Sequence, residues 1–455
     1  MIHFTNLAPA NEIGGNSYLV EFGNCRVALD AGTHPKREGL ETLPKLDLLD
    51  YDSLDGIFLT HAHLDHSGAL PVMMREHPSA RVFMSEATRE LADAMLHNSV
   101  NVMTSKREEL GDPSYPFYTH RELDKGFYRW EFPKTSKPFY FSDREEVTCE
   151  FHEAGHILGA VAPVFEWQGH RVLYTGDIHF EEQTLTVGAK LPEDGIDTVI
   201  VETTRGASPR DPDYTRAKEI QRLSDSISEI LDRGGSVLMP VFAMGKTQEL
   251  LLILHQLKES GQIPQHIPIT IGGLSTKMTM IYDRLAGRAN RNFPGFKILQ
   301  EVKLIVGSKK KSNRQIEYQP GSIYAISSGM VTEKTASNEL AGHFVSNPLS
   351  GILFVGYCDP DSPGGHLVAA NQGDKIKLRK NSEAFELRCN VEKFDFSGHS
   401  PRDSILDYLC KVRPKNILLV HGDRDALEWF EAKLNQHLPD SRVIIPVPGE
   451  RIELS

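Results

Sequence analysis

The chain lacks the cysteine pattern of a disulfide-stabilised domain or a thiolate zinc site. Its cysteines are odd in number, widely scattered and without any CxxC pair. Such usage is typical of proteins in a reducing compartment, so we expect a cytoplasmic protein without disulfides. The five are Cys25, Cys149, Cys358, Cys389 and Cys410.

Long apolar runs and a secretory leader are also missing. Residues 1–6 carry neither a basic segment nor an apolar one, so we expect no signal peptide. The apolar run 250–254 is far too short to span a bilayer, which requires about 20 residues. The sequence therefore predicts no membrane partner.

Basic residues are fewer than acidic ones. The chain has 50 Lys and Arg against 62 Asp and Glu, and its formal net charge is −12. Nucleic-acid binding through bulk positive charge is therefore not indicated, although a local basic groove or bound metal ions can still attract phosphate. A length of 455 residues with 40% hydrophobic residues predicts a soluble protein of two or more domains.

Residues 60–68 contain a dense group of metal-ligand side chains. They read T-H-A-H-L-D-H-S-G, which places His61, His63, Asp65 and His66 within one short loop. Imidazole and carboxylate are the ligands that zinc prefers after thiolate. The apolar run 56–59 before the loop is typical of a buried strand. A loop at the end of a rigid strand can hold exposed ligands in fixed positions.

The same pattern recurs along the chain, where an apolar strand is followed directly by an acid or a histidine. Single turn residues would explain each case alone, but five cases with metal-ligand side chains favour one site at one edge of stacked sheets. The five residues are Asp30, His61, Asp177, Glu202 and His421.

Two further histidines are candidates with plain structural alternatives. His156 lies in the segment 154–159 beside glycine, where a purely structural histidine is the alternative. His399 precedes Ser400 and Pro401, which we interpret as the N-cap and first residue of a helix. A histidine at a helix N-terminus can meet an anion, and a simple turn histidine is the alternative.

The middle of the chain alternates between strand and helix patterns, which predicts a small α/β domain. Its Gly245-Lys246-Thr247 follows a strand, but the phosphate-loop pattern needs glycine at position 240, which is proline, so an ATPase is not indicated. Residues 106–145 are interpreted as a long surface excursion. The basic run Lys309–Lys311 is interpreted as a solvated loop, with a phosphate contact as the alternative.

Taken together, these residues resemble the β-CASP branch of the metallo-β-lactamase superfamily, most closely its RNA-processing members, the cleavage and polyadenylation factor endonucleases and their prokaryotic relatives. The stretches 240–249 and 351–357 resemble segments of the β-CASP insertion. Arg205 and Lys246 depart from the usual Tyr and Arg, and 271–274 departs from a usual Asp-Ser-Pro, which puts substrate contacts in doubt. The matching motif residues are Asp30, His61, His63, Asp65, His66, His156, Asp177, Glu202, His399 and His421.

This resemblance implies an α/β fold. The expected architecture is a four-layer αβ/βα metallo-β-lactamase sandwich with an inserted α/β β-CASP domain. The sandwich would comprise residues 1–205 and 386–455, and the insertion residues 206–385.

The resemblance also implies the roles of the site residues. One zinc would be held by His61, His63, His156 and Asp177, and a second by Asp65, His66, Asp177 and His421, with manganese as the alternative metal. Asp30 would orient a histidine ligand, and Lys246 and Ser400 would contact substrate. Two zinc ions would lower the pKa of a shared water. Asp65, Glu202 and His399 are the expected catalytic residues. His399 would act as general acid or oxyanion stabiliser, with Glu202 holding its imidazole.

The expected function is zinc-dependent hydrolysis of phosphodiester bonds in RNA, with single-stranded RNA as the favoured partner. Within the family, a histidine at the last motif, here His421, is typical of members that act on RNA. A DNA nuclease of the same fold, a small-molecule metallohydrolase of thioesterase or lactamase type, and a weakly active scaffold subunit remain as alternatives. Endonuclease against exonuclease action and homodimer formation are left open.

Overall fold

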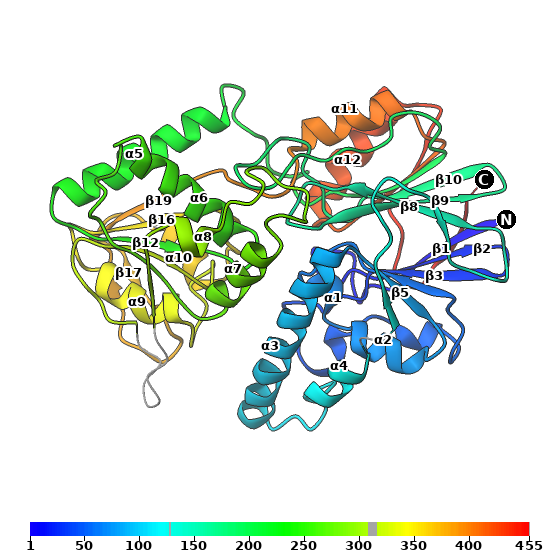
Figure 1. Ribbon diagram of the computed structural model, residues 1–455, viewed down its shortest axis with the longest axis horizontal. Helices are drawn as coiled ribbons and strands as arrows, with labels where there is room; N and C mark the ends of the chain where they lie inside the picture. The colour runs from blue at the N-terminus through cyan, green and yellow to red at the C-terminus, as the bar shows by residue number, and fades with distance from the viewer. Residues whose placement is uncertain (127–128, 308–315, 455) are drawn as a thin grey trace. The chain divides into compact units, whose positions relative to one another are not determined.

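The computed structural model describes residues 1–126, 129–307 and 316–454, which form two compact units (Figure 1). Unit 1 comprises Met1–Glu182, Val187–Arg210 and His399–Ser455, and unit 2 comprises Gln183–Thr186 and Asp211–Gly398. The basic run Lys309–Lys311 lies outside the described residues. The domain boundaries at 205 and 385 remain a prediction.

The first sheet of unit 1 has seven strands in the order β22-β1-β2-β3-β4-β5-β6. Neighbours from β22 to β3 are antiparallel, and those from β3 to β6 are parallel. The strands are β1 (Ile2–Asn6), β2 (Tyr18–Phe22), β3 (Cys25–Leu29), β4 (Gly56–Phe58), β5 (Arg81–Phe83), β6 (Trp130–Glu131) and β22 (Arg451–Leu454).

The second sheet of unit 1 also has seven strands, in the order β21-β20-β11-β10-β9-β8-β7. Its β9–β10 hairpin turns through Gln168 and Gly169, both at positive φ, as a two-residue hairpin requires. The strands are β7 (Phe139–Tyr140), β8 (Thr148–Glu153), β9 (Val161–Trp167), β10 (His170–Tyr174), β11 (Thr198–Glu202), β20 (Asn416–Val420) and β21 (Arg442–Ile444).

Side chains of both sheets share one core. Phe58 of β4 packs its ring against Phe83 of β5 and against Phe165 of the second sheet, with centroids 4.8 Å apart in each case. Because alternate residues of each strand point to this shared interior, the two sheets stack face to face. Helices lie on the outer side of each sheet (Figure 1), which confirms the predicted α/β sandwich.

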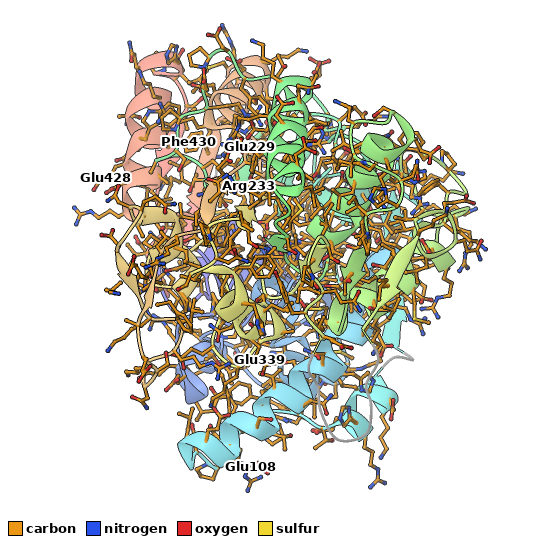
Figure 2. All side chains as sticks on the ribbon, turned by 90° about the vertical axis from the view of Figure 1, so that its left-hand side faces the viewer. Glu108, Glu229, Arg233, Glu339, Glu428 and Phe430 are labelled. Atoms are coloured by element: carbon orange, nitrogen blue, oxygen red, sulfur yellow. The ribbon has the colours of Figure 1, made fainter. Side chains whose placement is uncertain are left out.

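The helices of unit 1 follow sequence signals closely. The side chain of Ser85 accepts a hydrogen bond from the Thr88 amide and caps α3, as the sequence indicates. On α12, Phe430 is fully buried while the Glu428 side chain is 53% exposed (Figure 2). The helices are α1 (Leu64–Ser67), α2 (Leu70–Glu76), α3 (Glu86–Leu110), α4 (His120–Gly126), α11 (Arg402–Val412) and α12 (Arg424–His437), with short 3-10 turns at Gly39–Thr42 and Leu46–Leu48.

The interpretation of residues 106–145 as a surface excursion is wrong. This segment contains α4 and supplies edge strands β6 and β7 to the two sheets. Its aromatic side chains Tyr115, Tyr118, Trp130 and Phe141 are buried. The segment shows no helix or strand periodicity, because its buried aromatic residues are separated by polar ones. These aromatic side chains fill the ends of a core and do not form one face of a long element.

Unit 2 is built on a six-stranded parallel sheet, in the order β14-β13-β15-β12-β16-β19. A separate two-stranded ribbon is formed by β17 (Lys375–Ile376) and β18 (Phe385–Glu386). The sheet strands are β12 (Val237–Pro240), β13 (Ile269–Ile271), β14 (Leu304–Val306), β15 (Ile323–Ile326), β16 (Gly351–Phe354) and β19 (Asn390–Lys393). The helices are α5 (Arg216–Asp232), α6 (Lys246–Glu259), α7 (Leu274–Arg284), α8 (Ile298–Glu301), α9 (Ala336–Phe344) and α10 (Pro363–Ala369).

Across residues 1–126, 129–307 and 316–454, none of the helices has the length and apolar character needed to cross a bilayer.

Candidate metal centre

The acidic and histidine residues predicted at strand ends gather at one edge of the two sheets of unit 1. Asp30 follows β3, His61 follows β4, Asp177 follows β10, Glu202 ends β11 and His421 follows β20. Asp30 and His421 have φ values of 58° and 51°, in the left-handed region that side-chain-bearing residues seldom adopt. Such strained positions persist where the surrounding structure holds them firmly, as functional sites often do.

Two glycines allow the loops of this edge to come together. A Cβ atom on Gly32 would lie 1.7 Å from the carbonyl oxygen of Asp65, so no larger residue fits there. Gly176 has a φ of 52°, and a Cβ atom on it would meet the Thr60 side chain at 2.8 Å. Both glycines therefore set how closely the ligand-bearing loops approach one another.

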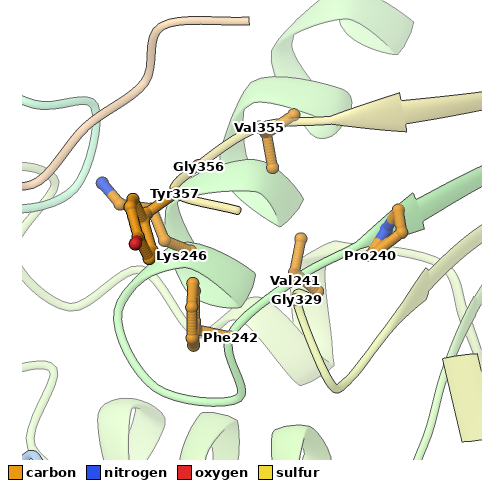
Figure 3. A pocket seen from close by; sticks show the side chains of 8 residues that line it. All are labelled: Pro240, Val241, Phe242, Lys246, Gly329, Val355, Gly356 and Tyr357. Carbon is orange, nitrogen blue, oxygen red and sulfur yellow. The ribbon is translucent and has the colours of Figure 1, made fainter. Parts of the chain in front are cut away.

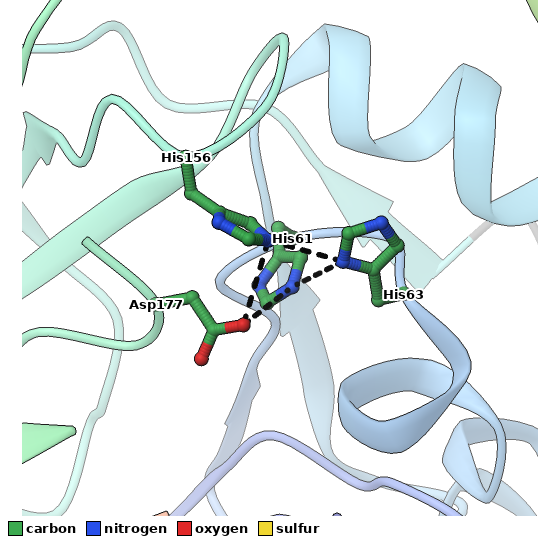
Figure 4. A group of neighbouring side chains, drawn as sticks. All are labelled: His61, His63, His156 and Asp177. Carbon is green, nitrogen blue, oxygen red and sulfur yellow. Dashed lines mark hydrogen bonds and ion pairs between the residues drawn. The ribbon is translucent and has the colours of Figure 1, made fainter. Parts of the chain in front are cut away.

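Four side chains, His61, His63, His156 and Asp177, form the first donor group (Figure 4). His63 Nδ1 lies 3.2 Å from His61 Nε2 and 3.1 Å from His156 Nε2. Asp177 Oδ2 lies 3.5 Å from the Nε2 atoms of both His61 and His156. Three imidazole nitrogens and one carboxylate oxygen that converge on one point are a donor set suited to a divalent metal ion such as zinc.

A second donor group consists of Asp65, His66 and His421, and Asp177 of the first group contacts two of its members. Asp177 Oδ1 lies 3.2 Å from His66 Nε2 and 3.4 Å from His421 Nε2, so the two oxygens of this carboxylate face different groups. Among the described residues, Oδ1 is buried and has no hydrogen-bond partner of acceptable geometry. A buried, unsatisfied carboxylate oxygen between imidazoles fits a bound cation.

The charge states of the first group suit metal binding. Burial lowers the pKa of His61 well below its ordinary value and also lowers the pKa of His63, so both imidazoles are neutral and have a free lone pair. Burial alone would raise the pKa of Asp177, but the surrounding histidines, His66 first, hold it well below the ordinary value. Asp177 is therefore an anion beside the neutral imidazoles of His61 and His63.

Asp30 fixes the orientation of His66 through four hydrogen bonds. Its carboxylate accepts from the Thr60 amide (2.7 Å), the Thr60 hydroxyl (2.8 Å), His66 Nδ1 (2.8 Å) and the Tyr174 hydroxyl (2.7 Å). Because Nδ1 of His66 donates to this carboxylate, its Nε2 is the nitrogen that faces the second group, and a metal ion there would displace the Nε2 proton, the arrangement that outer carboxylates impose on metal ligands. Burial opposes protonation of His66, yet Asp177 and Asp30 raise its pKa well above the ordinary value.

Three residues of these networks could not be recognised as functional from their sequence positions. Thr60 and Tyr174 hold Asp30, as described above. Asn16 places its amide nitrogen 2.7 Å from His421 Nδ1 and 2.9 Å from His66 Nε2, while its Oδ1 accepts from the Tyr18 hydroxyl at 2.8 Å. An asparagine before a strand is indistinguishable from a turn residue, and a tyrosine in a buried strand from a core residue, so only the three-dimensional structure identifies them.

His399 and Glu202 form a pair beside the first donor group. His399 Nδ1 lies 3.0 Å from each Glu202 carboxylate oxygen, and Glu202 Oε1 also accepts from the Ile178 amide at 2.8 Å. The ring of His399 lies 4.7 Å from that of His156, and its side chain is 21% exposed. Burial alone would lower the pKa of His399, but Glu202 and then Asp177 raise it above the ordinary value, which favours the protonated imidazole.

The prediction that Ser400 caps the following helix is wrong. Helix α11 begins at Arg402 with Pro401 as its N-cap and has no side-chain cap. The Ser400 hydroxyl is buried and accepts instead from the Phe180 amide at 2.9 Å, while the Ser400 amide donates to the Ile178 carbonyl at 2.7 Å. Its polar groups therefore tie the His399 loop to the segment after Asp177, and a substrate contact by Ser400 remains a prediction.

Lys246 belongs to unit 2, where it lines a small pocket at the carboxyl ends of β12, β15 and β16 (Figure 3). Its Nζ lies 3.2 Å from Gln183 Oε1. In parallel sheets, ligands bind at the carboxyl ends of strands, close to where the strand order reverses. The glycine of the Gly-Lys-Thr motif, Gly245, has a φ of 82° and starts α6, where its amide donates to Gln248 Oε1. The other lining residues are Pro240, Val241, Phe242, Gly329, Val355, Gly356 and Tyr357.

Three family models match successive parts of the chain. The metallo-β-lactamase superfamily model matches residues 10–225, the β-CASP domain model residues 247–367, and the model of a Zn-dependent metallo-hydrolase RNA specificity domain residues 385–446. The chain thus has the metallo-β-lactamase fold. More narrowly, it belongs to the β-CASP branch of that superfamily.

Curated relatives match nearly the whole chain. Cleavage and polyadenylation specificity factor 73 of Drosophila melanogaster is 27% identical over 96% of this chain and 62% of its own length. Endoribonuclease YSH1 of Candida glabrata is 30% identical over 95% of this chain and 56% of its length, and cleavage and polyadenylation specificity factor subunit 3 of Dictyostelium discoideum is 27% identical over 98% and 56%. The chain therefore spans little more than half the length of these relatives.

A solved structure also resembles the whole chain. It is the crystal structure of a protein of unknown function from Enterococcus faecalis V583, with a TM-score of 0.57, 15% sequence identity and coverage of 99% of each chain. At this identity the likeness supports the fold alone.

Proposed function

We propose that this protein is a metal-dependent ribonuclease that hydrolyses phosphodiester bonds. One observation carries the proposal: the two oxygens of Asp177 are divided between two buried donor groups, and His399 lies beside them, hydrogen-bonded to Glu202 and with its pKa raised above the ordinary value. This arrangement suits two metal ions with a proton donor next to them. The names of the relatives, which include endoribonucleases, support RNA as the substrate.

Two zinc ions are the proposed cofactors, with manganese as the alternative. His61, His63, His156 and Asp177 would hold one ion, and Asp65, His66, His421 and Asp177 the other, since these donors cluster in that way. Such a metal pair supplies Lewis-acid stabilisation of phosphoryl charge and activates water for attack. Asp30 would keep His66 in the tautomer that binds metal, through its hydrogen bond to Nδ1.

The protein side chains contribute the proton transfer. The imidazolium of His399 keeps its Nδ1 proton in the hydrogen bonds to Glu202 and offers the Nε2 proton to the leaving sugar oxygen of the substrate. Glu202 favours this charged form and fixes the ring, because its own carboxylate is held by the Ile178 amide. General-acid assistance of this kind typically contributes about 10²–10⁴-fold to the rate.

The proposed domain assignment and substrate contacts rest on membership of the family. We assign unit 1 to the metallo-β-lactamase domain and unit 2 to the β-CASP domain. Single-stranded RNA is the proposed substrate, with Lys246 and Ser400 as proposed contacts. The part matched by the RNA specificity model contains both His399 and His421, which favours RNA over DNA. A cytoplasmic location remains a prediction.

A single nuclease assay tests the proposed function. The zinc-loaded protein should cut an end-labelled single-stranded RNA, and an endonuclease should also open the circular form of that RNA, whereas a strict exonuclease would not. Matched DNA should be cut more slowly. Asp177→Ala should lose metal and cleavage together, because it removes an oxygen from both donor groups, while Asp407→Ala on the exposed face of α11 serves as the control. An RNA left intact by protein loaded with zinc or with manganese would reject the proposal.

The role of Lys246 has a separate test. Lys246→Ala should weaken RNA binding more than it slows hydrolysis of bis-p-nitrophenyl phosphate, since a lysine that contacts only the RNA backbone does not touch the small ester. Binding is measured by fluorescence anisotropy with a labelled RNA. Equal losses on both substrates would assign Lys246 a structural role through its contact with Gln183.

A further inference from the structure

Two histidines that lie outside the metal centre meet on neighbouring helices. His97 lies in the middle of α3, and His120 is the first residue of α4, which runs beside α3 (Figure 1). Their Nδ1 atoms are 2.7 Å apart. The two rings are within 12° of parallel with centroids 5.0 Å apart, so they approach through these nitrogens.

Both imidazoles are attached to well-fixed backbone. Helix α3 has 25 residues and is capped by Ser85. The start of α4 is fixed by a reciprocal pair of hydrogen bonds, in which the Thr119 amide donates to Glu122 Oε2 at 2.7 Å and the Glu122 amide donates to Thr119 Oγ1 at 3.3 Å. Leu123 of α4 is buried. The positions of the two histidines are therefore set by the fold and do not depend on a mobile loop.

Acidic groups on both helices favour one protonated nitrogen of the His97 ring. Asp93 Oδ1 lies 3.3 Å and Asp124 Oδ1 3.6 Å from His97 Nε2. These carboxylates favour a proton on Nε2, which leaves the Nδ1 lone pair directed at His120. Without a cation, the 2.7 Å contact requires one proton between the two Nδ1 atoms, since two bare lone pairs would repel. A carboxylate beside one ring nitrogen of a histidine, with the other ring nitrogen facing a second imidazole, provides the elements of a carboxylate–histidine–metal arrangement.

We propose that His97 Nδ1 and His120 Nδ1 form a second, peripheral site for a divalent transition-metal ion, with zinc as the ion best suited. Imidazole nitrogens select zinc and its neighbours over magnesium and calcium, which prefer oxygen ligands. Two zinc–nitrogen bonds at a tetrahedral angle place the nitrogens about 3.3 Å apart, so a small opening of the pair admits the ion in place of the shared proton. Water completes the coordination, and the 22% exposed His97 side chain gives the ion access from solvent.

The bound ion joins α3 to α4 and so restrains α4 against local opening. This inference does not depend on the proposed nuclease function, because neither histidine belongs to the metal centre. Amide exchange in residues 120–126 should slow when the ion binds. If α4 opens only after the ion leaves, zinc at about ten times its dissociation constant slows exchange roughly tenfold.

Hydrogen exchange with mass spectrometry tests this site on tag-free protein whose metal centre is already loaded with zinc. Added zinc should slow exchange in residues 120–126 about tenfold in the wild type and in the control His437→Gln, which replaces an exposed histidine on α12. His97→Gln and His120→Gln should abolish this zinc effect and bind one zinc ion fewer by equilibrium dialysis. Asp124→Asn should require more zinc for the same protection. An absent zinc effect in the wild type, or an equal effect in His97→Gln, would overturn the proposal.

Discussion

His399 is the side chain whose surroundings define its chemistry most clearly. It is hydrogen-bonded to a buried acid, Glu202, lies next to His156 and keeps part of its ring exposed. With Glu202 and Asp177 it forms a third cluster of possible ligands. In the proposed scheme His399 holds neither metal ion, so its loss should separate proton transfer from metal binding.

We therefore expect His399→Ala to retain its zinc while RNA cleavage falls by about 10²–10⁴-fold, the usual cost of a lost general acid. Glu202→Gln should cause a smaller loss, and the double variant should lose much less than the sum, because the two residues act as a unit. Metal analysis and cleavage rates on the same samples provide the measurement. Loss of zinc from His399→Ala, or unchanged cleavage, would contradict this role.

A second prediction concerns the Tyr174 hydroxyl. Its hydroxyl donates to Asp30 at 2.7 Å, and Asp30 in turn holds His66. Tyr174→Phe keeps the ring in the core but removes one of the donors to a buried carboxylate, which should weaken zinc binding by about 10–100-fold, the usual effect of changes behind a metal ligand. Zinc affinity is measured by competition with a chelator. Tyr408→Phe, which removes a hydroxyl bonded to the Pro192 carbonyl away from the centre, should leave the affinity unchanged.

The residues that carry recognisable chemistry could be predicted from the sequence, whereas their supports could not. His61, His63, His156 and Asp177 stand out because few structural reasons place so many ligand side chains after strands. Asn16, Thr60 and Tyr174 are common residues in common settings. Their importance arises only from neighbours that are distant in sequence, such as Asp30 for Tyr174.

Among the secondary-structure elements, α6 holds an unusual buried acid. Glu249 accepts hydrogen bonds from the amides of Thr184, Leu185 and Thr186 at 2.7–3.0 Å and pairs with Arg216 at 3.3 Å. The segment Gln183–Thr186 belongs to unit 2, although the residues on either side of it belong to unit 1. One carboxylate thus binds this short segment to α6.

Glu249→Gln should destabilise the protein by about 1–3 kcal/mol, because an amide replaces one acceptor oxygen with a donor that faces backbone N–H groups. Urea unfolding monitors the stability, and limited proteolysis should detect earlier cleavage near residues 183–186. Glu259→Gln, an exposed position on the same helix, is the matched control and should stay within about 0.5 kcal/mol. Equal stability of the two variants would mean that Glu249 does not hold the segment.

Regular elements with clear periodicity were the most predictable. The strands before Asp30, His61, Glu202 and His421 are confirmed. The predictions fail where tertiary contacts override local pattern. Residues 106–145 contain buried aromatic side chains that do not lie on one face of a helix or strand. Ser400 forms hydrogen bonds with Ile178 and Phe180 and does not cap α11.

Over the whole molecule, the reactivity of the cysteine thiols should differ between the folded and the unfolded chain. Cys25, Cys149, Cys358 and Cys389 are buried free thiols, whereas Cys410 is partly exposed. Burial raises the pKa of Cys25 and Cys389 to about 12 and that of Cys358 to about 11, and it raises the pKa of Cys149 well above its ordinary value. Burial raises the pKa of Cys410 as well, but its thiol remains accessible.

A thiol reagent applied near pH 8 should therefore label Cys410 first in the native protein and all five cysteines in urea, as peptide mass spectrometry can show. Because the folded-state pKa values lie above the unfolded ones, the buried thiols cost no stability below about pH 9. Stability should fall as the pH rises from about 9 towards 12, where only the unfolded chain releases these protons. Rapid native labelling of Cys149 or Cys389 would contradict the observed burial.

The pairing of strands that are distant in sequence also orders events during synthesis on the ribosome. In unit 1, β1 pairs with β22, and β11 pairs with β20, which carries His421 at its end. By contrast, the parallel sheet of unit 2 is complete within one continuous stretch that ends with β19. A nascent chain can therefore finish the sheet of unit 2 first, while the metal centre lacks a donor until residue 421 has left the exit tunnel. No shorter translation product can contain the full donor set.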